Sequence, residues 1–284
     1  MTDHALVWHK KAPEDTAVSG DDQLRLIGMP TGLVRPARQA MAAENLPPAA
    51  RDILHHVIAD LRRRVEQPDA PAQRYSLREL DETGKAAVAD ILGEGDVWAK
   101  VGVGRDFCRV VESVMAGIWR LEASDEHGIT DEWLEVGAVP EPFLRVAREG
   151  TRERIEIPKQ MPQGAMNAPF LLSELQDRSS KYVPGEENHV INFTLLPLTE
   201  MDAEVLTQIL GQAPLFIRSG GYGSSRVFAT GLRHVWAVQY VNGLGKVILD
   251  TLEVGGVPIA VVAAKEDFED SSERLAEILE AFAS

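Results

Sequence analysis

Cysteine is nearly absent from this 284-residue chain, in which Cys108 is the sole one. A single thiol excludes a disulfide within the chain, and it excludes a zinc or iron–sulfur centre that one chain would hold through two or more cysteines. Basic residues are scarce too, with 29 Lys and Arg against 44 Asp and Glu and a net charge of −15. Both halves are acidic, which excludes a basic nucleic-acid module because phosphate binding needs concentrated Lys and Arg.

Long apolar runs are also missing. No stretch of about 18 apolar residues occurs, so we predict no membrane insertion. The sequence from Met1 to His4 does not begin a basic-then-apolar export signal, which predicts a cytoplasmic location. With 44% hydrophobic and 26% charged residues, the composition is typical of a globular chain of one or two domains.

An internal repeat organises what is present. The segment 134–140 (Leu-Glu-Val-Gly-Ala-Val-Pro) recurs at 252–258 with six of seven residues identical, at a spacing of 118 residues. Other landmarks keep nearly this spacing: Ile91-Leu92-Gly93 matches Ile209-Leu210-Gly211, and Trp119 matches Trp236. We interpret the chain as two copies of one module.

The local patterns assign a coarse structure to each copy. In the first we expect a helix from about Ser76 to Leu92, then extended runs and a helix after Pro140. In the second, a capping box at 199–202 starts a helix, extended runs follow, and Asp270 begins the cap of a final helix. The segment 182–192 reads as an exposed connector.

These patterns predict an α+β fold rather than a doubly wound parallel sheet. It consists of two tandem copies of an α–antiparallel β-meander–α module. The predicted ranges are 1–25 for an N-terminal arm, 26–150 for the first module and 151–284 for the second.

The most suggestive local motif is Ser219-Gly220-Gly221-Tyr222-Gly223-Ser224-Ser225-Arg226. A glycine-rich backbone can hold an anion and Arg226 can add a bidentate contact, but a tight hairpin explains the glycines as well. The motif lacks the phosphate-loop and dinucleotide-binding patterns. Both readings, a turn and a site for an anion or peptide, stay open.

A second cluster surrounds the following strand, with Arg233, His234, Gln239 and Tyr240 near Trp236. No Ser or Asp at motif spacing completes a hydrolase triad with His234. Asp52 and His56 are helix neighbours, yet two ligands do not make a metal site. The sequence therefore predicts no catalytic residue, no cofactor and no bound metal.

The second half resembles the C-terminal region of the HupH/HyaF hydrogenase expression/formation family. The resemblance rests on Gly221-Tyr222-Gly223 with Arg226, and on the runs 161–169, 232–240, 249–254 and 257–258. The first half looks like a less marked copy of the same pattern. One departure is that Ser224 and Ser225 stand where this family commonly has Asn and Cys.

The resemblance implies a non-enzymatic accessory protein, or chaperone, for maturation of uptake [NiFe]-hydrogenase. It implies that the immature iron–sulfur small subunit, bearing a twin-arginine signal, is a partner, together with other hydrogenase accessory proteins. The richer second module leads us to place the partner-binding residues at Tyr222, Arg226, Arg233, His234, Gln239 and Tyr240. Two alternatives stay open: an enzyme, either a hydrolase or a transferase, that uses the Gly-Tyr-Gly loop, and a scaffold that links other maturation factors.

Overall fold

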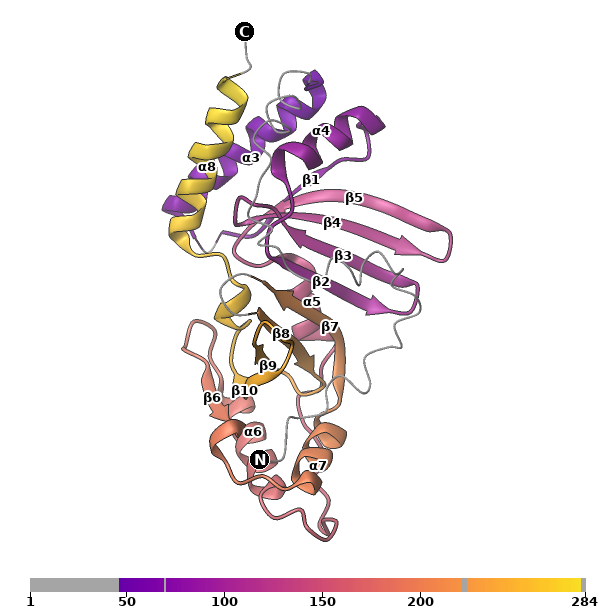
Figure 1. The fold of residues 1–284 in the computed structure, drawn as a ribbon, viewed down its shortest axis with the longest axis vertical. Helices are drawn as coiled ribbons and strands as arrows, with labels where there is room; N and C mark the ends of the chain where they lie inside the picture. Colours follow the sequence, from indigo (N-terminus) through magenta and orange to yellow (C-terminus); the bar gives the residue numbers. More distant parts are fainter. Residues whose placement is uncertain (1–45, 69, 221–223, 282–284) are drawn as a thin grey trace. The chain divides into compact units, whose positions relative to one another are not determined.

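The computed structural model describes residues 46–281 apart from 69 and 221–223. This part of the chain divides into two compact units (Figure 1). We call residues 46–141 with 261–281 the outer unit and residues 142–260 the inner unit, names that refer only to their places along the sequence. Both contain helices and antiparallel strands, so the predicted α+β class is confirmed. None of the described helices has the length and apolar character of a membrane span.

The outer unit is a five-stranded antiparallel sheet with three helices. Its strands lie in the order β1-β5-β4-β3-β2. The elements are α3 (Pro48–Glu66), β1 (Gln73–Ser76), α4 (Glu82–Leu92), β2 (Val97–Val103), β3 (Asp106–Glu112), β4 (Ile118–Asp125), β5 (Gly128–Val136) and α8 (Lys265–Glu280).

The inner unit has a sheet of the same kind, in the order β7-β8-β9-β10-β6. Its elements are α5 (Glu141–Glu149, beginning one residue before the unit), α6 (Ala168–Lys181), β6 (His189–Asn192), η2 (Phe193–Leu195), α7 (Glu200–Leu210), β7 (Gln212–Ser219), β8 (Ser224–Thr230), β9 (Val235–Val241), β10 (Val247–Val254) and η3 (Ile259–Val261, which ends one residue beyond it).

Both sheets are built in the same sequence of elements. In each, a helix and a short strand precede a second helix, and a four-stranded meander follows. Two tandem copies of one module would have the same order of elements, as these sheets do. That the two units arose by duplication stays a prediction. The boundaries of the compact units differ from the ranges 26–150 and 151–284. Helix α5 follows the meander of the outer unit but belongs mainly to the inner unit, and α8 follows the meander of the inner unit but belongs to the outer unit.

Three local predictions are corrected by the structure. The helix expected from Ser76 begins at Glu82, because the Asp81 carboxylate accepts the Gly84 N–H at 2.7 Å and caps the helix there. The final helix begins at Lys265 rather than near Asp270, since the Asp267 carboxylate accepts the Ala264 N–H. The expected connector 182–192 contains the edge strand β6.

A tryptophan and a glutamate fix equivalent points in the two sheets. Trp119 lies opposite Glu135, and Trp236 lies opposite Glu253. The Trp119 indole N–H donates to the Gly137 carbonyl at 2.8 Å, and the Trp236 indole N–H donates to the Gly255 carbonyl at 3.4 Å. These pairs give a common reference from which other positions in the sheets can be compared.

The core of the outer unit joins helices from the two ends of the described chain. Helix α3 has its buried residues three or four positions apart, which gives it one apolar face. That face packs with α8, whose buried residues Phe268, Leu275 and Leu279 belong to the same core cluster (Figure 1). The residues after 260 therefore complete a core begun at residue 46.

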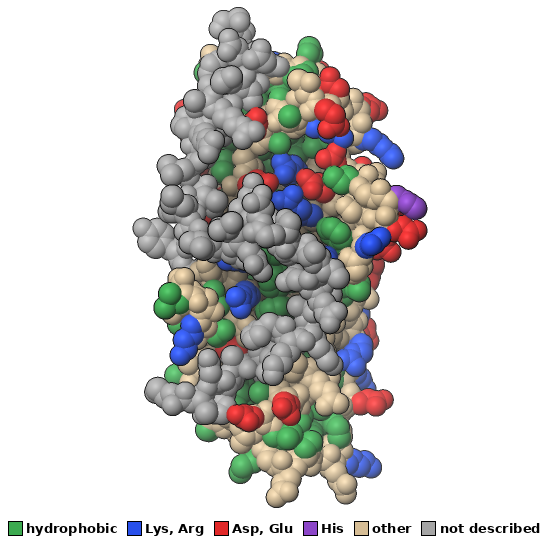
Figure 2. Space-filling model, turned by 45° about the vertical axis from the view of Figure 1, so that its right-hand side comes forward, with side chains coloured by type: hydrophobic (Ala, Val, Ile, Leu, Met, Phe, Trp, Pro, Cys, Tyr) green, Lys and Arg blue, Asp and Glu red, His purple; other side chains and the backbone are tan. Residues whose placement is uncertain are grey.

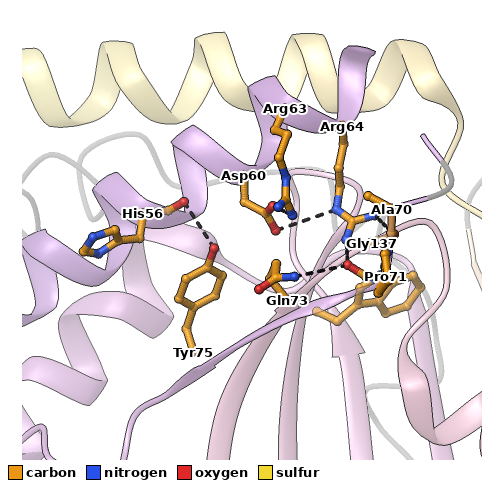
Figure 3. A network of polar contacts seen from close by, with 10 residues as sticks. His56, Asp60, Arg63, Arg64, Ala70, Pro71, Gln73, Tyr75 and Gly137 are labelled. Atoms are coloured by element: carbon orange, nitrogen blue, oxygen red, sulfur yellow. Dashed lines mark hydrogen bonds and ion pairs between the residues drawn. The ribbon is translucent and has the colours of Figure 1, made fainter. Parts of the chain in front are cut away.

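Arg64 ties the end of α3 to the chain that follows it (Figure 3). The side chain is 1% exposed and donates to the carbonyls of Ala70 at 2.8 Å and Pro71 at 2.5 Å. Its Nε lies 3.7 Å from Oδ2 of Asp60, which is itself buried. Burial lowers the pKa of Arg64, and the nearby Asp60 carboxylate opposes that shift. The guanidinium satisfies carbonyls that the turn into β1 would otherwise leave without donors.

We expect Arg64→Met to lower the free energy of unfolding by about 3 kcal/mol, because it removes the donors to the Ala70 and Pro71 carbonyls and one of the two arginines, with Arg63, that contact the buried Asp60 carboxylate. Arg62 is exposed on the same helix, so Arg62→Met should change it by less than about 0.5 kcal/mol. Urea unfolding followed by circular dichroism measures both. Equal effects of the two substitutions would contradict the role given to Arg64.

Asp202 is fully buried and joins two helices of the inner unit. Its Oδ1 accepts the backbone N–H groups of Asn167 and Ala168, each at 2.8 Å, where α6 begins. Its Oδ2 accepts the Thr199 N–H at 3.1 Å, and Thr199 Oγ1 accepts the Asp202 N–H at 3.0 Å, which confirms the predicted capping box. Burial acts to raise the pKa of Asp202, but the backbone donors outweigh it and the pKa is lowered.

A lowered pKa means that the folded state favours the ionised carboxylate. This stabilisation is present above the usual Asp pKa of 3.8 and is lost as pH falls through the folded-state value. Asp202→Asn should therefore destabilise by about 1 to 2 kcal/mol at pH 7. The gap between the two proteins should narrow as pH falls from 6 to 3, measured by urea unfolding at each pH. A gap that stays constant would show that the charge is not what matters.

Candidate functional site

The residues predicted to bind a partner do not form one site. Arg226 and Gln239 are direct cross-strand neighbours on β8 and β9. Arg233 and His234 lie in the turn between these strands, and Tyr240 points to the sheet face opposite to that of Gln239. Tyr222 lies outside the described residues. The structure thus brings together only one pair of the predicted set.

Arg233 is held in a bracing position. Its Nη1 contacts the Glu153 carboxylate at 2.7 Å, and its Nη2 donates to the Arg148 carbonyl at 3.0 Å. Its own carbonyl accepts the buried Ser179 hydroxyl of α6 at 2.6 Å. These contacts join the β8–β9 turn to α5 and α6.

His234 serves the same turn. Its φ of 60° lies in the left-handed region, which is uncommon for a residue other than glycine. The ring packs against Tyr182 with centroids 4.8 Å apart. Burial lowers the pKa of His234, and the positive charge of Arg233 lowers it further. These features give His234 a structural role in the turn.

Tyr240 and Glu253 are ionisable groups of the opposite face. Burial raises the pKa of Tyr240, and the charge of Glu253 raises it further. Burial also raises the pKa of Glu253, although Asn188 Nδ2 donates to its Oε2 at 3.1 Å and opposes the shift. This donor holds the segment before β6 against β10.

Four polar residues form a row across the inner sheet. Arg218 on β7 lies opposite Arg226 on β8, Arg226 lies opposite Gln239 on β9, and Gln239 lies opposite Asp250 on β10. Residues that are directly opposite on antiparallel strands share a face, so all four side chains lie on one face. We call this set the polar row. Sequence reasoning missed Arg218 because it lies outside the glycine-rich motif.

The polar row adjoins the apolar core of its unit. The next row on the same face lies two positions further along the strands and consists of Phe216, Phe228 and Ala237. The centroids of the Phe216 and Phe228 rings lie 5.0 Å apart. Gln239 is fully buried and donates from Nε2 to Asp250 Oδ2 at 3.3 Å. Arg218 and Arg226 are half-buried, so solvent reaches this end of the row.

The two arginines place like charges next to each other. Burial lowers the pKa of Arg218, and the positive charge of Arg226 lowers it further. No ion pair among the residues that the structure describes involves either arginine. The row can therefore offer several N–H donors to one negatively charged group.

A hollow in the surface lies beside α6 and β6. This hollow has a volume of about 520 Å³ and is lined mostly by charged side chains, among them Glu174, Asp177, Arg178 and Lys181. Arg178 pairs with Glu174 and Lys181 pairs with Asp177, each within one helix turn. His189 Nε2 lies 3.0 Å from Glu174 Oε1. Four of the charged side chains that line the hollow are thus paired with one another.

The remaining chemical candidates have structural surroundings. Cys108 is buried in β3. Asp52, His55 and His56 lie on α3, and no three His, Cys, Asp or Glu side chains of the described residues gather as a metal site would require. On the face shown in Figure 2, acidic and basic side chains are interspersed over the coloured surface. The coloured part of that face shows no basic patch of the kind that binds nucleic acid.

Comparison with known proteins places this α+β chain among hydrogenase expression and formation proteins. Residues 165–282 match the family described as HupH hydrogenase expression protein, C-terminal conserved region. Hydrogenase expression/formation protein HoxQ of Cupriavidus necator is 36% identical, over 91% of this chain and 92% of the relative. Hydrogenase expression/formation protein HupH of Rhodobacter capsulatus is 42% identical, over 73% of each chain.

A more distant relative is hydrogenase-1 operon protein HyaF of Escherichia coli K12, which is 31% identical over 71% of this chain and 70% of its own length. Identity at this level over most of both chains defines the family. The chain belongs to the HupH/HoxQ/HyaF family of hydrogenase expression/formation proteins.

The contrast between Arg233 and Arg226 can be tested through stability. Arg233→Gln should lower the free energy of unfolding by about 1 kcal/mol, because it removes the donor to the Arg148 carbonyl. Arg226→Gln should leave it unchanged or raise it, because it removes a like-charge pair. Urea unfolding of the two variants decides. A larger loss for Arg226→Gln than for Arg233→Gln would contradict this division.

Proposed function

We propose that this chain is a non-enzymatic accessory protein, acting as a chaperone in the maturation of uptake [NiFe]-hydrogenase. The observation that carries the proposal is the likeness to hydrogenase expression/formation protein HoxQ across 92% of that relative. A match over nearly the whole length makes a shared role more probable than a match confined to one module would. We place the protein in the cytoplasm, where maturation precedes export.

The proposed partner is the immature iron–sulfur small subunit with its twin-arginine signal. The charge of this chain supports the pairing, because a net charge of −15 attracts a basic segment and speeds encounter. Other hydrogenase accessory proteins are proposed as further partners. No cofactor is needed for such a role.

We place the partner surface on the inner unit. Tyr222 and Arg226 are its leading residues, because Tyr and Arg bury a large area and still make polar contacts. On the next strand, the buried Gln239 lies opposite Arg226, and Tyr240 lies opposite Ser225 on the other face of the sheet. Arg233 and His234 support this surface indirectly, through the turn that leads into β9.

Affinity capture tests the proposal. The tagged full chain is expressed in cells that make the hydrogenase, and the retained chains are identified by mass spectrometry. We expect the small-subunit precursor to be retained. Retention of accessory proteins without the precursor would favour the scaffold, and turnover of a small molecule at the Gly-Tyr-Gly loop would favour the enzyme.

Variants locate the surface. We expect Tyr222→Ala with Arg226→Ala to reduce capture of the precursor at least tenfold without lowering the melting temperature. Arg109→Ala is the matched control, because Arg109 lies opposite Glu122, three residues after Trp119, as Arg226 lies opposite Gln239, three residues after Trp236. Unchanged capture by the double variant, or loss that accompanies unfolding, would reject this surface.

A further inference from the structure

The outer sheet contains a row equivalent to the polar row. Lys100 on β2 lies opposite Arg109 on β3, Arg109 lies opposite Glu122 on β4, and Glu122 lies opposite Glu132 on β5. The Trp–Glu pairs show the equivalence. Glu122 follows Trp119 by three residues as Gln239 follows Trp236, and Glu132 precedes Glu135 by three residues as Asp250 precedes Glu253.

In the outer row, Arg109 has two carboxylate partners. Arg109 Nη1 lies 3.4 Å from Glu122 Oε2, and Arg109 Nη2 lies 3.5 Å from Glu94 Oε1. Glu132 is paired as well, at 2.5 Å from Lys85 Nζ. The Arg109 charge is thus neutralised within the unit, whereas Lys100 Nζ lies 4.7 Å from the centroid of the Phe107 ring.

In the inner row, amides replace the two carboxylates that contact Arg109, while Asp250 keeps a carboxylate at the place of Glu132. Gln239 stands at the place of Glu122. Gln212 stands at the place of Glu94, since each follows the glycine that ends its helix, Gly211 or Gly93. Arg226 is therefore left beside Arg218 without the two carboxylates that Arg109 has.

The repulsion between Arg218 and Arg226 destabilises the inner sheet, and the fold does not require two arginines at these positions. Like charges directly opposite on neighbouring strands destabilise a sheet, and partial burial of the guanidinium groups strengthens the repulsion. The outer sheet shows that the same strand geometry accommodates compensating glutamates. A bound anion would supply the missing charge.

We propose that Arg218 and Arg226 form a binding site for an oxyanion, a carboxylate or a phosphate group. The guanidinium forks supply paired N–H donors that match the geometry of either group. The half-buried position makes each contact stronger than on an open surface and still leaves access from solvent. The neutral Gln239 amide keeps the site from being filled by a carboxylate of the chain itself. This site does not depend on the role in hydrogenase maturation.

The test is titration of the full chain with inorganic phosphate and, separately, with glutarate, at constant ionic strength set by chloride. The Nε–Hε resonances of arginine report binding, and the melting temperature reports stabilisation. We expect saturable shifts of the Arg218 and Arg226 signals and a rise in melting temperature. A response to phosphate alone identifies phosphate groups as the natural ligand, and a response to glutarate alone identifies carboxylates.

Three variants separate the site from general salt effects. Arg218→Gln with Arg226→Gln should weaken binding at least about tenfold, since charge-assisted hydrogen bonds are lost, and should not lower the melting temperature without anion. Gln239→Glu should weaken binding similarly, by supplying an internal carboxylate as Glu122 does. Arg109→Gln should bind as the natural sequence does.

Absence of saturable shifts with both anions would overturn the proposal. So would equal anion stabilisation in the natural sequence and in the double arginine variant. Capture of the small subunit is measured separately, so a chain that binds phosphate without capturing the subunit leaves this site intact and rejects only the maturation proposal.

Discussion

The register of the antiparallel strands is the constraint on which the rest of this structure depends. In each unit, direct pairing of neighbouring strands aligns side chains in rows that alternate between the two faces. A slip of one residue in β8 or β9 would move Arg226 and Gln239 to opposite faces and would bury charge in the apolar row beside them. The buried Trp–Glu pairs oppose such a slip, because each indole N–H finds its carbonyl only in the observed register.

Buried polar groups fix the helices around these sheets. Arg64 satisfies carbonyls of the turn between α3 and β1, and Asp202 satisfies the N–H groups at the start of α6 and α7. Arg64 thereby holds the end of α3 to the chain that follows it, and Asp202 joins two helices whose partner residues are 34 and 35 positions away. The same helices contribute apolar side chains to the two cores. Specific geometry therefore comes from a few satisfied polar groups, and most of the burial comes from the apolar clusters.

The two sheets treat the same positions in different ways. The outer unit neutralises Arg109 with glutamates, whereas the inner unit presents Arg218 and Arg226 with glutamines at the corresponding places. This difference is consistent with a division of labour, in which carboxylates of the chain neutralise Arg109 and, under our proposal, a bound anion neutralises Arg226. The net charge of −15 repels anions from the chain as a whole. Under our proposal, the two arginines would therefore bind only an anion that is well placed to contact them.

Much of the architecture follows from the sequence alone. Local patterns determined the α+β class, the meander strands, the capping box at Thr199 and the repeated landmarks, since capping and alternation act over a few residues. Local signals did not reveal the edge strands β1 and β6, because four-residue strands with few apolar residues are defined by their partners. The tertiary structure alone decided that α8 completes the core begun by α3, and that Arg218 lies opposite Arg226 while Arg233 braces a turn. These outcomes depend on contacts between residues distant in sequence or on exact strand register, which no local pattern encodes.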